Sequence, residues 1–183
     1  MKRWLYGAAA GALALVALVE GGRAGLIAAK AFAAPVLIEA AFERSAETGK
    51  PEKPWPWADA PPRWQLTAPA VGLDRFVLEG ATMRALAFGP VHQRMGAAHL
   101  VFGHRDTHFA ALGRLIEGDL IVTAEPGGHT REWRVERHWV ANEDALYVPG
   151  GGDEAGLLLV TCFPFDAITA GGKGRYLVWA VPK

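Results

Sequence analysis

The sequence contains only one cysteine, Cys162, and it has no long block of charge of one sign. A single thiol has no partner within the chain, so a fold held together by internal disulfides is excluded. Nineteen Lys and Arg balance nineteen Asp and Glu, and the basic stripe needed to bind a phosphate backbone is missing. Nucleic acid is therefore not an expected partner. Internal repeats and low-complexity tracts are also missing.

The N-terminus has a stretch without charge. Lys2 and Arg3 precede the sixteen residues Trp4–Val19, which are rich in Ala, Leu and Val. A basic flank followed by an apolar segment indicates an export or anchoring signal. At about 1.5 Å per residue this segment spans roughly 24 Å, slightly less than a hydrocarbon core of about 30 Å, and the residues as far as Ile27 close the gap.

We therefore expect residues 1–23 to form an uncleaved signal anchor. This transmembrane helix would make the chain a single-pass protein of the inner (cytoplasmic) membrane, with the remainder on the periplasmic side. A cleaved signal peptide is the alternative, because Ala31-Phe32-Ala33 has the small-x-small pattern of a cleavage site.

Two further segments precede the β-rich part of the chain. Residues 24–46 carry apolar side chains at loosely helical spacing, which predicts a second, amphipathic juxtamembrane helix that either lies on the membrane or packs on the domain. Pro35 predicts a kink or a break in it. Residues 47–63 contain five prolines together with Trp55 and Trp57. This composition predicts a semi-rigid extended spacer whose tryptophans pack against the outer wall of the domain.

Residues 64–183 have a β pattern, in which short apolar or alternating runs are separated by Gly, Pro, Asn and Asp. So many short runs leave little room for helices, apart from one or two turns at Phe109–Ile116, and they predict a mostly β domain, either a closed barrel or a sandwich. The predicted strands are Trp64–Leu66, Arg75–Leu78, Ala98–Phe102, Leu120–Ala124, Glu132–Val140, Ala145–Tyr147, Leu157–Thr161 and Arg175–Ala180.

Cys162 stands where one predicted strand ends, and Arg175 opens the next. A thiol that attacks an amide needs a general acid for the departing amine and a positive partner for the tetrahedral oxyanion. His104, two residues after the strand Ala98–Phe102, and Arg175 are residues of these two kinds. The pattern favours Cys162 as a nucleophile, and an inert buried thiol is the alternative.

These residues occur in a recognisable set. The segments Gly103-His104-Arg105-Asp106-Thr107-His108-Phe109 and Leu159-Val160-Thr161-Cys162, followed by Arg175, resemble the sortases. The resemblance covers roughly residues 64–181. The Trp-Pro spacer and the form of the histidine segment are most similar to the Gram-negative class GN sortases. Leu158 departs from the family pattern, because it replaces the first threonine of the cysteine motif, and we expect it to serve in packing.

The resemblance implies a closed eight-stranded β-barrel and a cysteine transpeptidase. Cys162 would attack a carbonyl in the C-terminal sorting signal of a partner protein and form a thioacyl-enzyme. His104 would protonate the leaving amine, and Arg175 would hold the substrate and stabilise the oxyanion. An amine acceptor of unknown identity would then resolve the intermediate. The alternatives are a cysteine endopeptidase that releases the partner by hydrolysis and a non-catalytic barrel that binds peptides. We expect a monomer that needs no cofactor.

Three further residues near these motifs are candidates for substrate binding, namely Thr161, His108 and Asp106. Asp106 either orients His104 or caps backbone amides in a turn. His104 and His108 stand four residues apart, but no third ligand supports a metal site, so we predict none. Carboxylate clusters that would favour calcium are also missing. Packing or surface roles are expected for the other histidines, which are His92, His99, His129 and His138.

Overall fold

The computed structural model describes residues 2–169 and 172–183, and the side chains of residues 2–12, 14 and 23–31 also lie outside the description. The chain divides into two compact units, Met1–Val36 and Leu37–Lys183. A single helix, α1 (Lys2–Thr48), covers both segments for which the sequence predicted separate helices, and it contains Pro35.

The described part of α1 corrects the predicted localisation. Within the residues that the structure describes, no helix has a stretch both long and apolar enough to cross a bilayer. The prediction of a single-pass protein of the inner membrane is therefore wrong. The physical reason is the short apolar run, because Trp4–Val19 spans roughly 24 Å of helix and Glu20 follows it directly. The basic flank at Lys2 and Arg3 lies outside the described side chains.

The last turns of α1 pack on the barrel of the second unit. Ile38, Ala41 and Ser45 are buried at helical spacing. The ring of Phe42 lies 5.1 Å from that of Phe76, measured between centroids. The Ser45 hydroxyl accepts a hydrogen bond of 2.9 Å from the backbone N–H of Glu52, which fixes the chain as it leaves the helix. The C-terminal part of the predicted amphipathic segment thus packs on the domain.

The Pro/Trp-rich segment is the next part of the chain, and its two tryptophans have different surroundings. The Trp55 ring meets Phe88 edge-on at a centroid distance of 5.1 Å, as expected for a side chain that packs on the outer wall. Trp57, in contrast, is 76% exposed. The prediction that both rings pack on the wall is therefore correct for Trp55 only.

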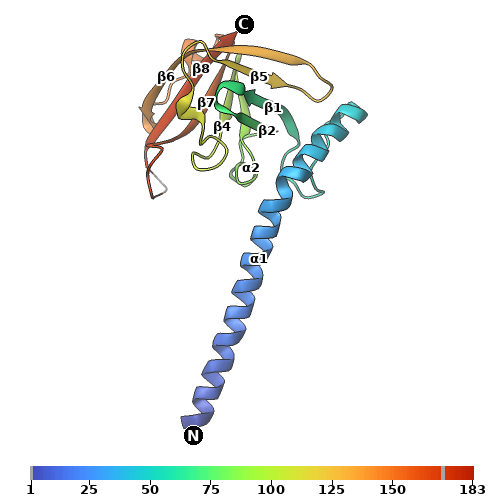
Figure 1. The fold of residues 1–183 in the computed structure, drawn as a ribbon, viewed down its shortest axis with the longest axis vertical. Coiled ribbons are helices and arrows are strands. Elements are labelled where there is room, and N and C mark those ends of the chain that lie inside the picture. The colour runs from blue at the N-terminus through green and yellow to red at the C-terminus, as the bar shows by residue number, and fades with distance from the viewer. Residues whose placement is uncertain (1, 170–171) are drawn as a thin grey trace. The chain divides into compact units, whose positions relative to one another are not determined.

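The part of the second unit that the structure describes contains a closed barrel of eight strands in the order β1-β2-β3-β4-β7-β8-β6-β5 (Figure 1). The predicted closed eight-stranded barrel is confirmed. Two of its pairings, β2 with β3 and β4 with β7, are parallel. The strands are β1 (Pro62–Ala68), β2 (Leu73–Glu79), β3 (Val91–Met95), β4 (Ala98–Phe102), β5 (Leu120–Ala124), β6 (Thr130–Asn142), β7 (Gly156–Phe163) and β8 (Gly174–Pro182).

The connections between these strands contain only short helical segments within the described chain. Helix α2 (Met83–Leu86) joins β2 to β3, and 3-10 turns at Leu112–Arg114, Glu143–Ala145 and Pro149–Gly152 lie in later connections. The turn at Leu112–Arg114 falls within the predicted helical interruption, Phe109–Ile116.

Strands β7 and β8 are buried on both faces, so they separate two apolar clusters. Leu157, Leu159 and Val178 face the barrel core, whereas Leu158 and Leu177 belong to a cluster on the other face. This alternation follows from the two-residue period of a strand and explains why both strands are continuous apolar runs. Leu158 packs opposite Trp179, as expected for the position that departs from the sortase motif.

Two details of the strand assignment differ from the sequence prediction. Strand β3 was not predicted, because its sequence Val-His-Gln-Arg-Met ends in three exposed residues with little apolar signal. The predicted strand Ala145–Tyr147 is wrong. The Asn142 side chain accepts a hydrogen bond of 3.1 Å from the backbone N–H of Asp144, which starts a 3-10 turn and ends the ladder.

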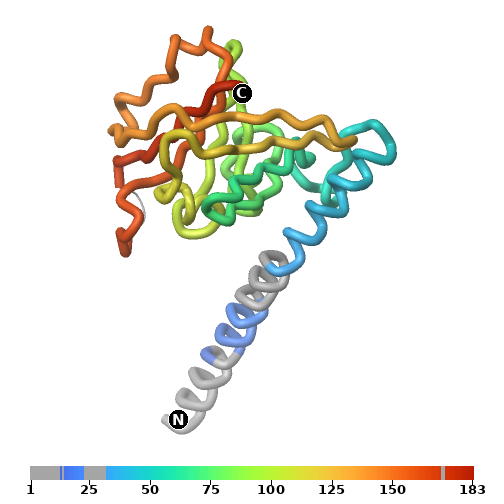
Figure 2. Tube along the Cα trace, turned by 45° about the horizontal axis from the view of Figure 1, so that its top comes forward, coloured from blue at the N-terminus to red at the C-terminus, as the bar shows by residue number. Residues whose placement is uncertain are grey.

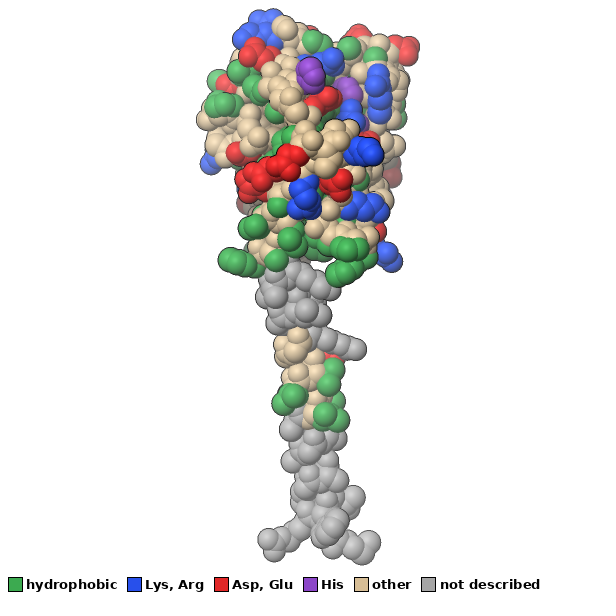
Figure 3. Space-filling model, turned by 90° about the vertical axis from the view of Figure 1, so that its right-hand side faces the viewer, with side chains coloured by type: hydrophobic (Ala, Val, Ile, Leu, Met, Phe, Trp, Pro, Cys, Tyr) green, Lys and Arg blue, Asp and Glu red, His purple; other side chains and the backbone are tan. Residues whose placement is uncertain are grey.

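Charged side chains of both signs lie interspersed on the face of the barrel unit shown in Figure 3. The net charge of the whole chain is zero with neutral histidines. Any role of charge must therefore arise from local groupings of side chains.

Candidate active site

Strand β7 changes from buried to half-buried at Cys162. Residues Gly156–Thr161 are buried, whereas Cys162 and Phe163 are partly exposed. Cys162 lies directly opposite Arg175 in the antiparallel ladder of β7 and β8. Residues directly opposite each other in such a pair project from the same face of the sheet, so the thiol and the guanidinium leave the barrel on one side.

Strand β4 brings His104 to the same end of β7. Phe102 lies opposite Val160 in the parallel pairing of β4 with β7, and the backbone N–H of Gly103 donates to the Val160 carbonyl at 3.1 Å. His104 follows Gly103 directly, so it lies just beyond the end of β4, next to the end of β7 that carries Cys162. Three neighbouring strands therefore present the three predicted residues at one mouth of the barrel.

Gly103 is required at the turn between β4 and His104. A Cβ atom at this position would lie 2.6 Å from Cδ2 of the buried Phe109 ring. The Thr161 hydroxyl donates to the Gly103 carbonyl at 2.7 Å. Thr161 is buried, and its hydroxyl links β7 to the turn that carries His104. The structure therefore places Thr161 beneath the surface on which Cys162 is partly exposed.

The Arg175 guanidinium is oriented by contacts on two sides. One terminal nitrogen, Nη1, donates to the carbonyls of Gly172 at 2.6 Å and Gly174 at 2.8 Å. The other, Nη2, forms an ion pair with the Glu143 carboxylate. Within the described contacts, Nε and one Nη2 hydrogen have no partner, so donors are left for a ligand.

The C-terminal two thirds of the chain match a family model. The model describes the sortase domain, and the match covers residues 66–183. The chain belongs to the sortase family. Among curated proteins, none matches the chain.

Solved sortase structures share this fold at low sequence identity. Sortase A from Listeria monocytogenes has a TM-score of 0.58 and 18% identity, over 67% of this chain and 87% of its own. Sortase A from Corynebacterium diphtheriae has a TM-score of 0.58 and 19% identity, over 82% and 84%. A Clostridium perfringens sortase D5 transpeptidase has a TM-score of 0.52 and 20% identity, over 67% and 79%. At such identities the likeness concerns the fold alone.

Arg105 connects the two loops that flank the site of this sortase. Its side chain is 7% exposed, and its guanidinium donates to the carbonyls of Pro164 at 2.6 Å and Ala167 at 2.9 Å. The loop that follows Cys162 is thus tied to the histidine segment, and Figure 2 shows the β4–β5 and β7–β8 connections at one end of the barrel. The Asp106 hydrogen bond is the main cause that raises the pKa of Arg105, and the nearby Cys162 contributes.

The described hydrogen bonds of the Asp106 carboxylate are with Arg105 rather than with His104 or a backbone amide. Oδ1 accepts from Nε of Arg105 at 2.8 Å, and Oδ2 accepts from Nη2 at 3.3 Å. This hydrogen bond lowers the pKa of Asp106. Of the two roles predicted for Asp106, the described contacts show neither. Asp106 instead helps to hold the guanidinium that secures the loop.

His108 stands next to His104 at the sortase site. The two rings are stacked with a centroid distance of 6.0 Å and an interplanar angle of 28°. Burial lowers the pKa of His108 to about 4, and the His104 charge adds to this effect. His108 is therefore neutral near pH 7. Among the residues that the structure describes, no group of three His, Cys, Asp or Glu side chains is placed to hold a metal ion.

Two residues of the site were not identified from the sequence. Arg105 belongs to the motif around His104, and this position could have identified it as a site residue. Its contacts with Pro164 and Ala167 could not be predicted from the sequence. Glu143 gave no signal, because its contact with Arg175 depends on the turn after β6 and on the β6–β8 pairing.

Proposed function

We propose that this sortase is a cysteine transpeptidase that cleaves a C-terminal sorting signal of a partner protein and transfers the partner to an amine. The observation that carries this proposal is the juxtaposition of three strand ends, in which Cys162 is opposite Arg175 and His104 follows the end of β4 beside β7. The partial exposure of Cys162 supports a reactive rather than an inert thiol.

In the first step the Cys162 thiolate attacks the carbonyl carbon of the scissile amide through Sγ, with His104 in its protonated form. The C–S bond forms and the C–N bond breaks, while His104 donates a proton to the departing amine. The free N–H groups of Arg175 stabilise the oxyanion of the tetrahedral intermediate. The product is a thioacyl-enzyme on Cys162.

In the second step an incoming amine attacks the thioester. His104 accepts the proton of this amine, the new C–N bond forms, and the thiolate leaves. Water can replace the amine, so hydrolysis is the competing reaction at the same site. The assignment to the class GN sortases remains a prediction. The sorting signal and the amine acceptor used by this chain are not identified by it.

The test is to trap the acyl-enzyme. Wild-type chain and Cys162→Ala are incubated with membranes of the native cells, and the intact masses of both are measured. We expect a mass adduct that is released by hydroxylamine in the wild type and no adduct in the variant, with equal circular dichroism for the two. An adduct of the same mass on Cys162→Ala would exclude the proposal.

A second measurement separates transfer from hydrolysis. The trapped thioacyl-enzyme is mixed with increasing concentrations of a primary amine, and the masses of the released products are measured by mass spectrometry. Transfer predicts that the amide product increases with amine concentration. If only the hydrolysed product forms at every amine concentration, the chain is an endopeptidase that releases its partner and not a transpeptidase.

A further inference from the structure

A pocket lies at the end of the barrel opposite Cys162. Its volume is about 390 Å³, and its lining includes Ala97 and Ala155, which immediately precede β4 and β7. His104 and Cys162 follow or stand in the distal ends of these same strands. The pocket is therefore separate from the proposed active site, and none of the sortase chemistry described above uses it.

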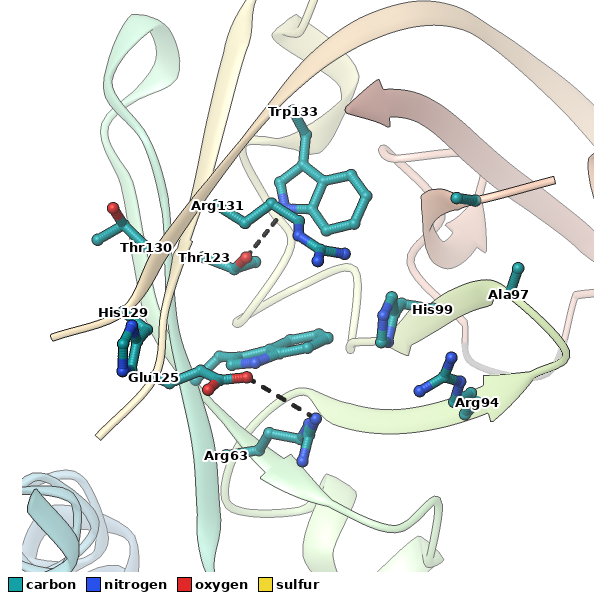
Figure 4. A pocket seen from close by; sticks show the side chains of 12 residues that line it. Arg63, Arg94, Ala97, His99, Thr123, Glu125, His129, Thr130, Arg131 and Trp133 are labelled. Carbon is teal, nitrogen blue, oxygen red and sulfur yellow. Dashed lines mark hydrogen bonds and ion pairs between the residues drawn. The ribbon is translucent and has the colours of Figure 1, made fainter. Parts of the chain in front are cut away.

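Three arginines point their guanidinium groups into this pocket (Figure 4). Arg63 has carboxylate partners, with Nε at 3.2 Å from Glu79 and Nη2 at 4.0 Å from Glu125. For Arg94 and Arg131 no carboxylate partner occurs among the described residues. Two cationic groups are thus left uncompensated, which favours an anionic ligand.

The contacts that do hold these two arginines leave most of their N–H groups open. Nε of Arg94 donates to the Gly96 carbonyl at 2.8 Å. The guanidinium of Arg131 lies over the Trp133 ring, 5.3 Å from its centroid. Trp133 is itself fixed, because its Nε1 donates to the Thr123 hydroxyl at 2.9 Å. The Arg131 guanidinium therefore stands on a rigid aromatic ring.

A buried chain of hydrogen bonds leads to His99 at the edge of the pocket. Nδ1 of His92 lies 3.2 Å from the Glu79 carboxylate, and Nε2 of His92 lies 3.0 Å from Nδ1 of His99. Burial is the main cause that lowers the pKa of both rings, to about 4 for His99, so both are neutral near pH 7. Each neutral ring carries one proton.

The positions of these protons follow from the chain of bonds. The Glu79 carboxylate only accepts, so the proton of His92 is on Nδ1 and its Nε2 is an acceptor. Nδ1 of His99 must then carry the proton that it donates to His92. Nε2 of His99 is left as an unprotonated acceptor. Since His99 lines the pocket together with the three arginines and Glu125, a ligand meets the His99 acceptor beside several cationic donors.

We propose that this pocket binds the phosphoryl group of a phosphomonoester. A singly protonated phosphomonoester has one P–O–H group, which donates to Nε2 of His99, and anionic oxygens, which accept from the arginines. A carboxylate ion or a sulfate ester has only acceptor oxygens, so it would face the His99 lone pair without a proton. The pocket volume leaves room for the organic part of the ester. That part is either a soluble molecule or a lipid.

The test compares two ligands of the same shape, ethyl phosphate and ethyl sulfate, by calorimetry with the full chain at pH 6. We expect ethyl sulfate to bind at least about tenfold more weakly, because it lacks the donated proton. Equal affinities would overturn the proposal, since they would indicate that the pocket binds any anion by charge alone, without a hydrogen bond to His99. Absence of ethyl phosphate binding would overturn it as well.

A matched pair of variants locates the site. Arg131→Gln removes an uncompensated charge of the pocket, and Arg134→Gln removes an exposed arginine that projects from the opposite face of β6. We expect the Kd for ethyl phosphate to rise about tenfold or more in the first variant and to stay unchanged in the second. An equal loss in both would refute a specific pocket.

Two further arms identify the source of the phosphoryl group and separate this site from catalysis. Flotation with phosphatidylcholine vesicles that do or do not contain phosphatidic acid distinguishes a lipid ester from a soluble one. Binding to ethyl phosphate without binding to phosphatidic acid assigns a soluble ester. Acylation of Cys162 should proceed at an unchanged rate in Arg131→Gln, and Cys162→Ala should bind ethyl phosphate as the wild type does. A loss of phosphate binding in Cys162→Ala would contradict the separation of the two sites.

Discussion

Arginines at the two ends of the barrel differ in how their charge is compensated. At the end with Cys162, Arg175 is paired with Glu143 and Arg105 with Asp106. At the opposite end, Arg94 and Arg131 have no carboxylate partner among the described residues, and Arg63 alone is paired. The chain thus places compensated and uncompensated guanidinium groups on one small scaffold.

This difference follows from what each end is proposed to bind. A neutral peptide acquires negative charge only in the transition state, so a guanidinium that is held in position by a carboxylate serves without attracting other anions. A ligand that is charged in its ground state gains most from cations without a partner. We therefore infer that an arginine with a carboxylate partner stabilises a transition state and that an arginine without one binds a ligand in its ground state. Four experiments examine the two ends of the barrel.

The largest effect is expected for Arg175. We expect Arg175→Gln to lower the rate of acylation of Cys162 by about 100-fold or more, because an oxyanion donor with full charge is lost. Arg175→Lys retains the charge but not the planar fork, so it should recover only part of the rate. Single-turnover kinetics with a reactive thioester measure both variants. A change in KM with an unaltered kcat would show that Arg175 binds the ground state instead.

Arg105 should affect stability more than any surface arginine. Arg105→Met removes the buried donors that hold Pro164 and Ala167, and we expect a loss of about 2 to 3 kcal/mol in the free energy of unfolding. Asp106→Asn is the control, because the Asp106 side chain is 69% exposed and its replacement should cost much less. Urea unfolding measures both. Similar losses in the two variants would mean that the ion pair, and not the contacts with the loop, stabilises this region.

Acid should destabilise both ends of the barrel. Burial lowers the pKa of His99 and of His108 to about 4, below the ordinary value of 6.5. The unfolded chain therefore binds more protons between these values, and the stabilisation present above pH 6.5 is lost as the pH falls toward 4. We expect a loss of about 2 kcal/mol from His99 and less from the half-buried His108. Urea unfolding at pH 7 and 4.5 should show a smaller decrease in His108→Asn, and an unchanged decrease would contradict the assignment.

Glu143 should have the smallest effect of the four. We expect Glu143→Ala to lower the acylation rate about tenfold, because Arg175 loses a group that orients it. Glu143→Gln keeps an acceptor oxygen and should retain most of the activity. A faster reaction in Glu143→Ala would show that the carboxylate competes with the substrate for the guanidinium, and it would reverse the interpretation of the paired arginines.

The strands near the proposed active site could be predicted from the sequence, because β7 and β8 are buried on both faces and are therefore continuous apolar runs. The strand-end positions of Cys162 and Arg175 followed from these runs, and that of His104 followed from the apolar run Ala98–Phe102 of β4. Their roles remain proposals. The predicted membrane-spanning segment had composition and a basic flank to support it, and among the residues that the structure describes no helix is long and apolar enough to cross a bilayer.

The opposite end of the barrel could not be predicted in the same way. His92 and His99 were expected to have ordinary packing or surface roles, and both are in fact buried and hydrogen-bonded to each other. Their contact depends on β3, whose polar sequence gave no strand signal. A pairing between a strand that is not recognised and its neighbour cannot be deduced from spacing along the chain.

The parallel pairing of β4 with β7 has a consequence during synthesis of the chain. Thr161 and Gly103, which join the two strands, are 58 residues apart in the sequence, and Arg175 lies on β8, which follows the other barrel strands along the chain. A nascent chain cannot assemble the site until β8 has left the ribosome and closed the barrel. The Cys162 thiol would therefore acquire its proposed partners only after β8 has been synthesised, so a nascent chain without β8 would lack the proposed site.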